Sequence, residues 1–103
     1  MKTIHKQVLP WKAAEEVTIQ IPKKSLHLDI QLQEGEGGVP EVTVWYLCDP
    51  EAETEELIFR IVGTGWELQD DFANRHYWLK SLQHDGYVWH VFLKKPVERI
   101  KIG

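Results

Sequence analysis

The histidine, cysteine and serine side chains are the groups in this chain best suited to catalysis or metal binding. The histidines have none of the HxxxH or HxH spacings typical of metal ligands; they are His5, His27, His76, His84 and His90. Cys48 is the only cysteine, and the acidic Asp49 beside it disfavours a reactive thiolate. Ser25 and Ser81 lie in no motif that pairs a nucleophile with a base. We therefore expect no enzyme activity, no catalytic residue, no metal site and no bound cofactor.

Three other features have structural explanations. Residues 63–65 read Gly-Thr-Gly, but no Gly-Lys-Ser/Thr follows as in a phosphate loop, so we expect a turn. Asp70 and Asp71 are neighbours that would point apart, and we expect one of them to cap a short helical turn. His90 lies within an apolar run, where a hydrogen-bonded structural histidine is expected rather than a catalytic one.

The segment from residue 66 to residue 78 is the main candidate for a binding site, because long loops in small domains often carry function. Its aromatic, arginine and histidine side chains suit either a protein hot spot or a pocket for a flat anionic ligand. They are Trp66, Phe72, Arg75, His76, Tyr77 and Trp78. Arg60 ranks lower, because it is equally suited to pair with an acid across a sheet. In the alternative interpretation, Trp66 and Phe72 only plug one end of the fold.

The elements that would position these residues are short β-strands, because apolar side chains recur mostly with a period of two. Apolar and polar side chains alternate in three runs, residues 4–8, 17–21 and 26–33. Three other runs are apolar on both faces: residues 42–47, 57–62 and 87–93. Two further strands are expected at residues 77–83 and 97–102. In the run 26–33, the expected buried face holds Leu26, Leu28, Ile30 and Leu32, and the wet face holds His27, Asp29, Gln31 and Gln33. The runs that are apolar on both faces are typical of strands covered above and below.

Turn signals separate these runs. Asp85-Gly86 predicts a type I′ hairpin, and Asp49-Pro50-Glu51 predicts a turn. Only residues 13–16 and 68–75 are candidates for a short helix. We therefore predict an all-β fold in which residues 1–103 form a single domain. This domain is an antiparallel β-sandwich or small barrel of about seven or eight strands, with at most one short helical turn.

Composition limits the classes of protein to consider. The five tryptophans, three tyrosines and three phenylalanines allow a stable core without disulfides, which a single cysteine excludes within the chain. We expect no signal peptide, no membrane partner and a cytoplasmic location. The net charge of −4 disfavours nucleic-acid binding. The five acids between Asp49 and Glu56 are either a docking site for a basic partner or a solvated loop.

Four strings of residues carry a resemblance to a known family. They are MKTIHK at 1–6, EVTIQIP at 16–22, FRIVGTG at 59–65 and VWHVF at 88–92. With shorter matches they cover most of the chain, which resembles a family of small uncharacterised proteins encoded by phages and prophages. The resemblance implies a small accessory protein of a virus within a host bacterial cell, and it implies no fold, activity or site residue.

Two functions from different classes remain. The first is a protein-binding module that docks onto a host protein through residues 66–78 or the acidic run, for instance as an inhibitor of host defence. The second is a small-ligand sponge for a signalling nucleotide, with Arg60 or Arg75 on the phosphate and Trp66, Trp78 or Trp89 on the base. A structural or assembly protein of a virion is a further alternative. We favour the first, and the aromatic content with bare strand edges also favours a homodimer.

Overall fold

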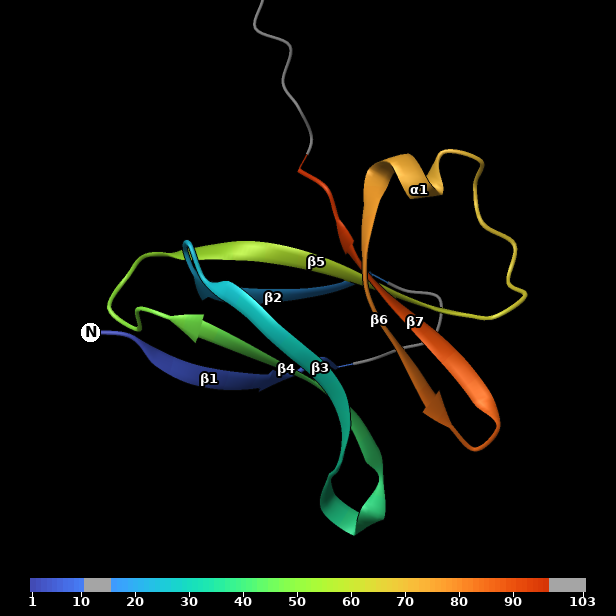
Figure 1. Ribbon diagram of the computed structural model, residues 1–103, viewed down its shortest axis with the longest axis horizontal. Helices are drawn as coiled ribbons and strands as arrows, with labels where there is room; N and C mark the ends of the chain where they lie inside the picture. The colour runs from blue at the N-terminus through green and yellow to red at the C-terminus, as the bar shows by residue number, and fades with distance from the viewer. Residues whose placement is uncertain (11–15, 97–103) are drawn as a thin grey trace, which may run out of the picture.

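The computed structural model, in which residues 1–10 and 16–96 are described, contains two antiparallel β-sheets (Figure 1). The strands are β1 (Thr3–Val8), β2 (Glu16–Pro22), β3 (Leu26–Glu34), β4 (Pro40–Cys48), β5 (Thr54–Gly63), β6 (His76–His84) and β7 (Tyr87–Lys94). Two short helical turns, η1 (Glu36–Gly38) and α1 (Phe72–Arg75), interrupt them. One sheet has the order β1-β4-β3 and the other β2-β5-β7-β6. The predicted all-β fold is confirmed; the expected strand 97–102 and residues 13–15 of an expected helix lie outside the described residues, and Glu16 belongs to β2.

The core lies between the two sheets and follows from the alternating pattern. In β2, Val17, Ile19 and Ile21 are buried and the residues between them are exposed. Val17 is the register partner of Phe59 in β5, and Ile61 two residues further along is fully buried as well. Residues paired across antiparallel strands share a face, so these apolar side chains form one inner surface.

The pairing of β3 corrects one detail of the expected pattern. A bulge shifts its register against β4 between His27 and Asp29. Leu28 is the extra residue, with no register partner in β4, and the residues before it face the opposite way from the expected pattern. Leu26 and Leu28 are therefore exposed, while Ile30 is fully buried. The expectation of one buried leucine face along the whole run is therefore wrong, and His27 takes an inward position.

A second bulge lies in β6, between Trp78 and Lys80. Lys80 Nζ donates to Asp29 Oδ1 at 2.9 Å, so an ion pair joins the two bulged strands. These strands, β3 and β6, are edges of different sheets that contact each other. The ion pair thus closes one side of the sandwich.

Two of the predicted turns are confirmed and one capping prediction is wrong. Asp85 and Gly86 have φ of 49° and 79°, the positive values that a type I′ hairpin requires at both positions. The Glu51 amide donates to Asp49 Oδ1 at 3.0 Å, which fixes the turn before β5. Asp71 occupies the N-cap position of α1, but its side chain makes no capping hydrogen bond; its carboxylate lies 3.7 Å from Arg75 Nη1.

Two connections cross between the sheets at the same end of the molecule. They are the turn from β2 to β3 and the turn from β4 to β5. The Lys23 amide donates to the Glu53 carbonyl at 2.8 Å, and their side chains form an ion pair at 3.2 Å. These contacts hold together the end of the sandwich that lies nearest to the cavity described below.

Candidate functional site

Two aromatic rings in the first half of the predicted 66–78 segment contact β7, although the residues around them are exposed. Figure 1 shows this connection and α1 arching from the end of β5 to the start of β6. Trp66 packs edge-to-face on Trp89 at 5.7 Å. Phe72 stacks on His76 at 4.0 Å and meets Phe92 edge-on at 5.0 Å. These contacts favour the alternative in which Trp66 and Phe72 serve packing, and a binding role for them stays a prediction.

The side chains predicted to hold a nucleotide are divided between two hollows. Arg60 and Arg75 line a hollow of about 270 Å³ together with three carboxylates, Glu16, Glu67 and Asp71. Trp66 and Trp89 line a separate hollow of about 410 Å³ beside the β6–β7 turn. The structure therefore does not bring the arginines and these tryptophans together in one pocket.

The arginine hollow is electrostatically balanced. Lys94 Nζ donates to Glu16 at 2.8 Å, and this bond together with Arg60 and His76 holds the pKa of Glu16 below its usual value. Asp71 pairs with Arg75. Arg60 Nε is buried without a hydrogen-bond partner among the described residues. The carboxylates of Glu16 and Asp71 lie in the same hollow as the two guanidinium groups, and their negative charge weakens the attraction of the hollow for a phosphate.

Tyr77 and Trp78 are the most exposed aromatic residues of the predicted segment, and Trp66 is 37% exposed. Tyr77 and Trp78 are 52% and 60% exposed and lie on β6, an edge strand of its sheet. As neighbours in a strand they project to opposite faces. Trp78 Nε1 donates to Ser81 Oγ at 3.1 Å, and Lys95 Nζ lies 4.7 Å from the centre of the Tyr77 ring.

His90 is held by hydroxyl groups on both sides of its ring. Its Nε2 lies 2.8 Å from Thr64 Oγ1, and its Nδ1 lies 2.7 Å from Ser81 Oγ. The predicted hydrogen bonding of His90 is confirmed, and the contact with Ser81 joins a hydroxyl to an imidazole that no sequence motif had paired. That the role of His90 is structural rather than catalytic stays a prediction. His76, unlike His90, is buried, and its Nδ1 lies 2.9 Å from the Phe72 carbonyl oxygen.

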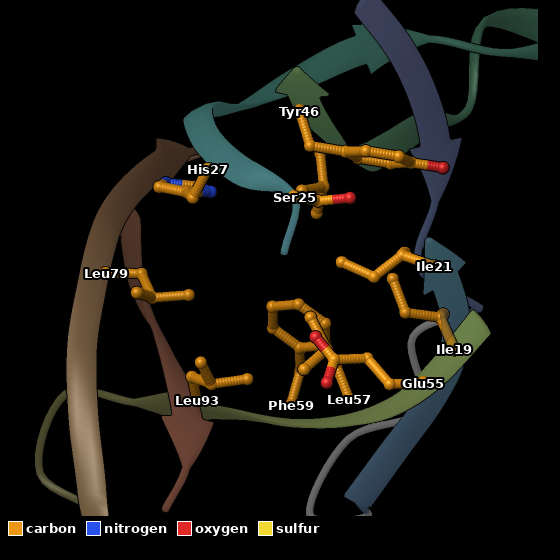
Figure 2. A pocket seen from close by; sticks show the side chains of 11 residues that line it. Ile19, Ile21, Ser25, His27, Tyr46, Glu55, Leu57, Phe59, Leu79 and Leu93 are labelled. Carbon is orange, nitrogen blue, oxygen red and sulfur yellow. The ribbon is translucent and has the colours of Figure 1, made fainter. Parts of the chain in front are cut away.

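A cavity of about 240 Å³ lies between the two sheets and was not predicted from the sequence (Figure 2). Its walls are mainly apolar; among them are Ile19, Ile21, Leu57, Phe59, Leu79 and Leu93. Figure 2 shows Leu79 and Leu93 facing Ile21 across the space, with Phe59 and Leu57 along one wall and Tyr46 opposite them. The cavity is partly open to solvent.

The polar groups of this cavity are neutral apart from one carboxylate. Burial lowers the pKa of His27, which favours the uncharged imidazole, and burial raises the pKa of Tyr46, which favours the phenol. Neither the His27 ring nor the Tyr46 hydroxyl has a hydrogen-bond partner among the described residues. Ser25 donates to the Pro22 carbonyl. Glu55 supplies the formal charge of the lining.

Only part of this site carried a signal in the sequence. Glu55 alternates with Leu57 and Phe59, so a carboxylate on an apolar face was visible in the pattern. His27 reaches the cavity because of the bulge, which alternation alone does not reveal.

A closed apolar cavity of this size would be costly to leave empty. At about 24 cal/mol per Å³, a closed cavity of this volume costs up to about 6 kcal/mol, compared with a total stability of about 5–15 kcal/mol for a domain. The opening to solvent reduces that cost. An apolar ligand that fills the cavity would recover part of this free energy.

Within residues 1–10 and 16–96, no group of three or more His, Cys, Asp or Glu side chains is placed to hold a metal ion. No helix in that part of the chain has the length and apolar character for a membrane span.

A family model described as a domain of unknown function, DUF7352, matches residues 1–101. Comparison with curated proteins and with solved structures gave no match.

Proposed function

The chain belongs to the DUF7352 family, and because that family's function is unknown, we propose from the geometry that the protein acts by binding another protein. The binding surface is the outer edge of β6, with Tyr77 and Trp78 as its anchors. The observation that carries this proposal is the exposure of two large aromatic rings on β6. Among the described residues this strand forms backbone hydrogen bonds with β7 alone, and β3 contacts it through the Asp29–Lys80 ion pair.

The chemistry of the β6 edge suits a protein partner. Tyrosine and tryptophan are enriched among the residues that dominate protein interfaces. An edge strand also offers unpaired backbone groups to an incoming strand. The Trp78 ring is held by its bond to Ser81, so little rotational freedom is lost when a partner covers it.

The test uses a double variant and a matched control. We expect a protein carrying Tyr77→Ser and Trp78→Ser to lose a saturable partner that the wild type captures from the lysate of its host bacterium. The variant Tyr87→Ser removes another strongly exposed aromatic ring, at the β6–β7 turn, and should retain that partner. Binding is then measured with the purified partner by biolayer interferometry. Equal affinity of the wild type and the double variant would refute the role of this edge.

The resemblance to phage and prophage proteins supports the setting of this proposal. It favours a viral accessory protein in the cytoplasm of a bacterium, and a host protein as the partner. Inhibition of a host defence system is one activity that binding alone would explain. A nucleotide sponge is the second candidate, with Arg60 beside Arg75 as its supporting observation, and a rise in melting temperature with a nucleotide would favour it.

We also propose a homodimer formed through the outer face of the three-stranded sheet. Ile4 in β1 and Leu26 in β3 are both register partners of Leu47 in β4, so the three form an apolar row. Ile4 and Leu26 are each 59% exposed. Trp45 lies on the same face of β4. The run 42–47 is apolar on both faces, which is typical of a strand that is covered on both sides.

Sedimentation equilibrium tests the homodimer. We expect the wild type to dimerise and Ile4→Lys to be monomeric, because the charge would be buried in the interface. Val39→Lys places the same charge on an exposed loop residue and should leave the dimer intact. A wild type that stays monomeric at high micromolar concentration would rule this dimer out.

A further inference from the structure

We propose that the cavity between the two sheets binds a small organic cation, namely a primary amine attached to an aromatic body. This site is distinct from the β6 edge, because Tyr77 and Trp78 do not line it. Three features of the cavity carry the inference: its apolar walls, its unpartnered neutral polar groups and its single carboxylate.

The apolar walls define the body of the ligand. A cavity of about 150 Å³ lined by leucine, isoleucine and phenylalanine stays dry and accepts benzene. The cavity between the sheets is larger, at about 240 Å³; most of its lining residues are of the same kind, and it is partly open to solvent. Figure 2 shows the Phe59 ring and the Leu57, Leu79 and Leu93 side chains converging on the space. A phenyl or slightly larger aromatic body fits this volume and chemistry.

The neutral polar groups define where the polar end of the ligand lies. The Tyr46 hydroxyl and the His27 ring have no hydrogen-bond partner among the described residues, and burial favours the uncharged state of both. Each therefore offers a lone pair to a donor. Figure 2 shows the two groups on opposite sides of the space. An ammonium group carries three N–H donors and accepts no hydrogen bond, so it suits either acceptor.

The carboxylate defines the charge of the ligand. Glu55 lies at the start of β5, lines the cavity, and has no ion-pair partner among the described residues. It belongs to the run of five acids between Asp49 and Glu56, of which Glu53 is paired with Lys23. The resulting negative potential favours a cation and disfavours a carboxylate or a phosphate.

Three compounds with one phenyl body separate the contributions of shape and charge. They are 2-phenylethylamine, 2-phenylethanol and 3-phenylpropanoate, titrated into full-length protein with labelled methyl groups and followed by NMR. We expect saturable shifts of the Ile21, Leu57 and Leu79 methyl signals with the amine, weaker binding of the alcohol, and the weakest binding of the carboxylate. The Leu68 methyl signals, outside the cavity, should not move.

Two variants test the location of the site. Leu79→Trp fills the cavity and should abolish binding of the amine, whereas Leu68→Trp places the same ring outside and should not. Glu55→Gln should weaken the amine about two- to fivefold, as expected for a solvent-exposed ion pair, and leave the alcohol unchanged. Thermal melts confirm that each variant is folded, and Leu93→Phe replaces Leu79→Trp if the latter is not.

Several results would overturn the proposal. They are the absence of any saturable shift with the amine, equal affinity for the amine and the carboxylate, or unchanged binding by the cavity-filling variant. The double variant at Tyr77 and Trp78 leaves this cavity intact and should bind the amine normally. Failure of protein binding and failure of amine binding are therefore distinguishable.

Discussion

Replacing Asp29 with asparagine should reduce the stability of the protein in a pH-dependent way. The Asp29 carboxylate accepts hydrogen bonds from Lys80 Nζ at 2.9 Å, Gln31 Nε2 at 2.7 Å and the Ile30 amide at 2.8 Å. These bonds, led by that from Lys80, lower the pKa of Asp29 from 3.8 to about 2. An asparagine oxygen can still accept a hydrogen bond from the Ile30 amide, so the substitution mainly removes the charge.

The size and sign of the effect follow from this pKa. A fall from 3.8 to about 2 corresponds in full to about 2.4 kcal/mol. The Asp29 and Lys80 side chains are 37% and 40% exposed, and screening by solvent reduces the expected contribution to about 1 kcal/mol. Because the folded-state pKa is lowered, this stabilisation is fully present above pH 4 and is lost as the pH falls through about 2.

Urea denaturation of the wild type and Asp29→Asn, at pH 6 and at pH 2, measures the difference. We expect the variant to be about 1 kcal/mol less stable at pH 6 and nearly equal to the wild type at pH 2. Glu53→Gln removes a more exposed pair with Lys23 and should cost less than about 0.5 kcal/mol. Equal stabilities of wild type and Asp29→Asn at pH 6, or a difference that does not shrink in acid, would refute the reasoning.

Two further predictions concern the 66–78 segment. In Gly63→Ala the new Cβ would lie 2.7 Å from Trp66 Nε1 and 3.2 Å from Trp89 Cζ3, so Trp66 must move. We expect a loss of about 1–2 kcal/mol and a changed tryptophan emission spectrum; an unchanged spectrum would mean that this contact is absent. In Phe72→Ala the stack on His76 is lost. Hydrogen exchange should accelerate in residues 64–75 and stay unchanged in β2 and β5, and uniform acceleration would show that the segment is not a local unit.

The strands and hairpins of this fold were predictable because local pattern decides them. The run around β2 alternates in sequence and in burial, and Asp85-Gly86 has the positive φ values that its turn type demands. The bulges in β3 and β6 were not predictable, because an extra residue in one strand is fixed by its neighbours in space. The alternating pattern predicted that Leu26 and Leu28 are buried, and because of the bulge they are exposed.

The candidate site was predicted only in part because it depends on contacts between distant segments. The aromatic content of residues 66–78 was plain in the sequence, but the burial of His76 and the exposure of Trp78 depend on where β7 and the edge of the sheet lie. The cavity collects side chains from six strands and one turn, and no spacing along the chain relates them. His27 is an example, because the bulge in β3 decides on which face of the strand its side chain lies.

The bulges also connect the stability of the molecule with the cavity. The β3 bulge directs His27 inward, and the β6 bulge places Leu79, the residue between Trp78 and Lys80, on the cavity wall. The same irregularities bring Asp29 and Lys80 together, and that ion pair closes the side of the sandwich next to both residues. Removing the charge of Asp29 should therefore weaken binding of an aromatic amine as well as stability. If Asp29→Asn lowers stability but binds the amine with unchanged affinity, the ion pair supports the fold without shaping the cavity.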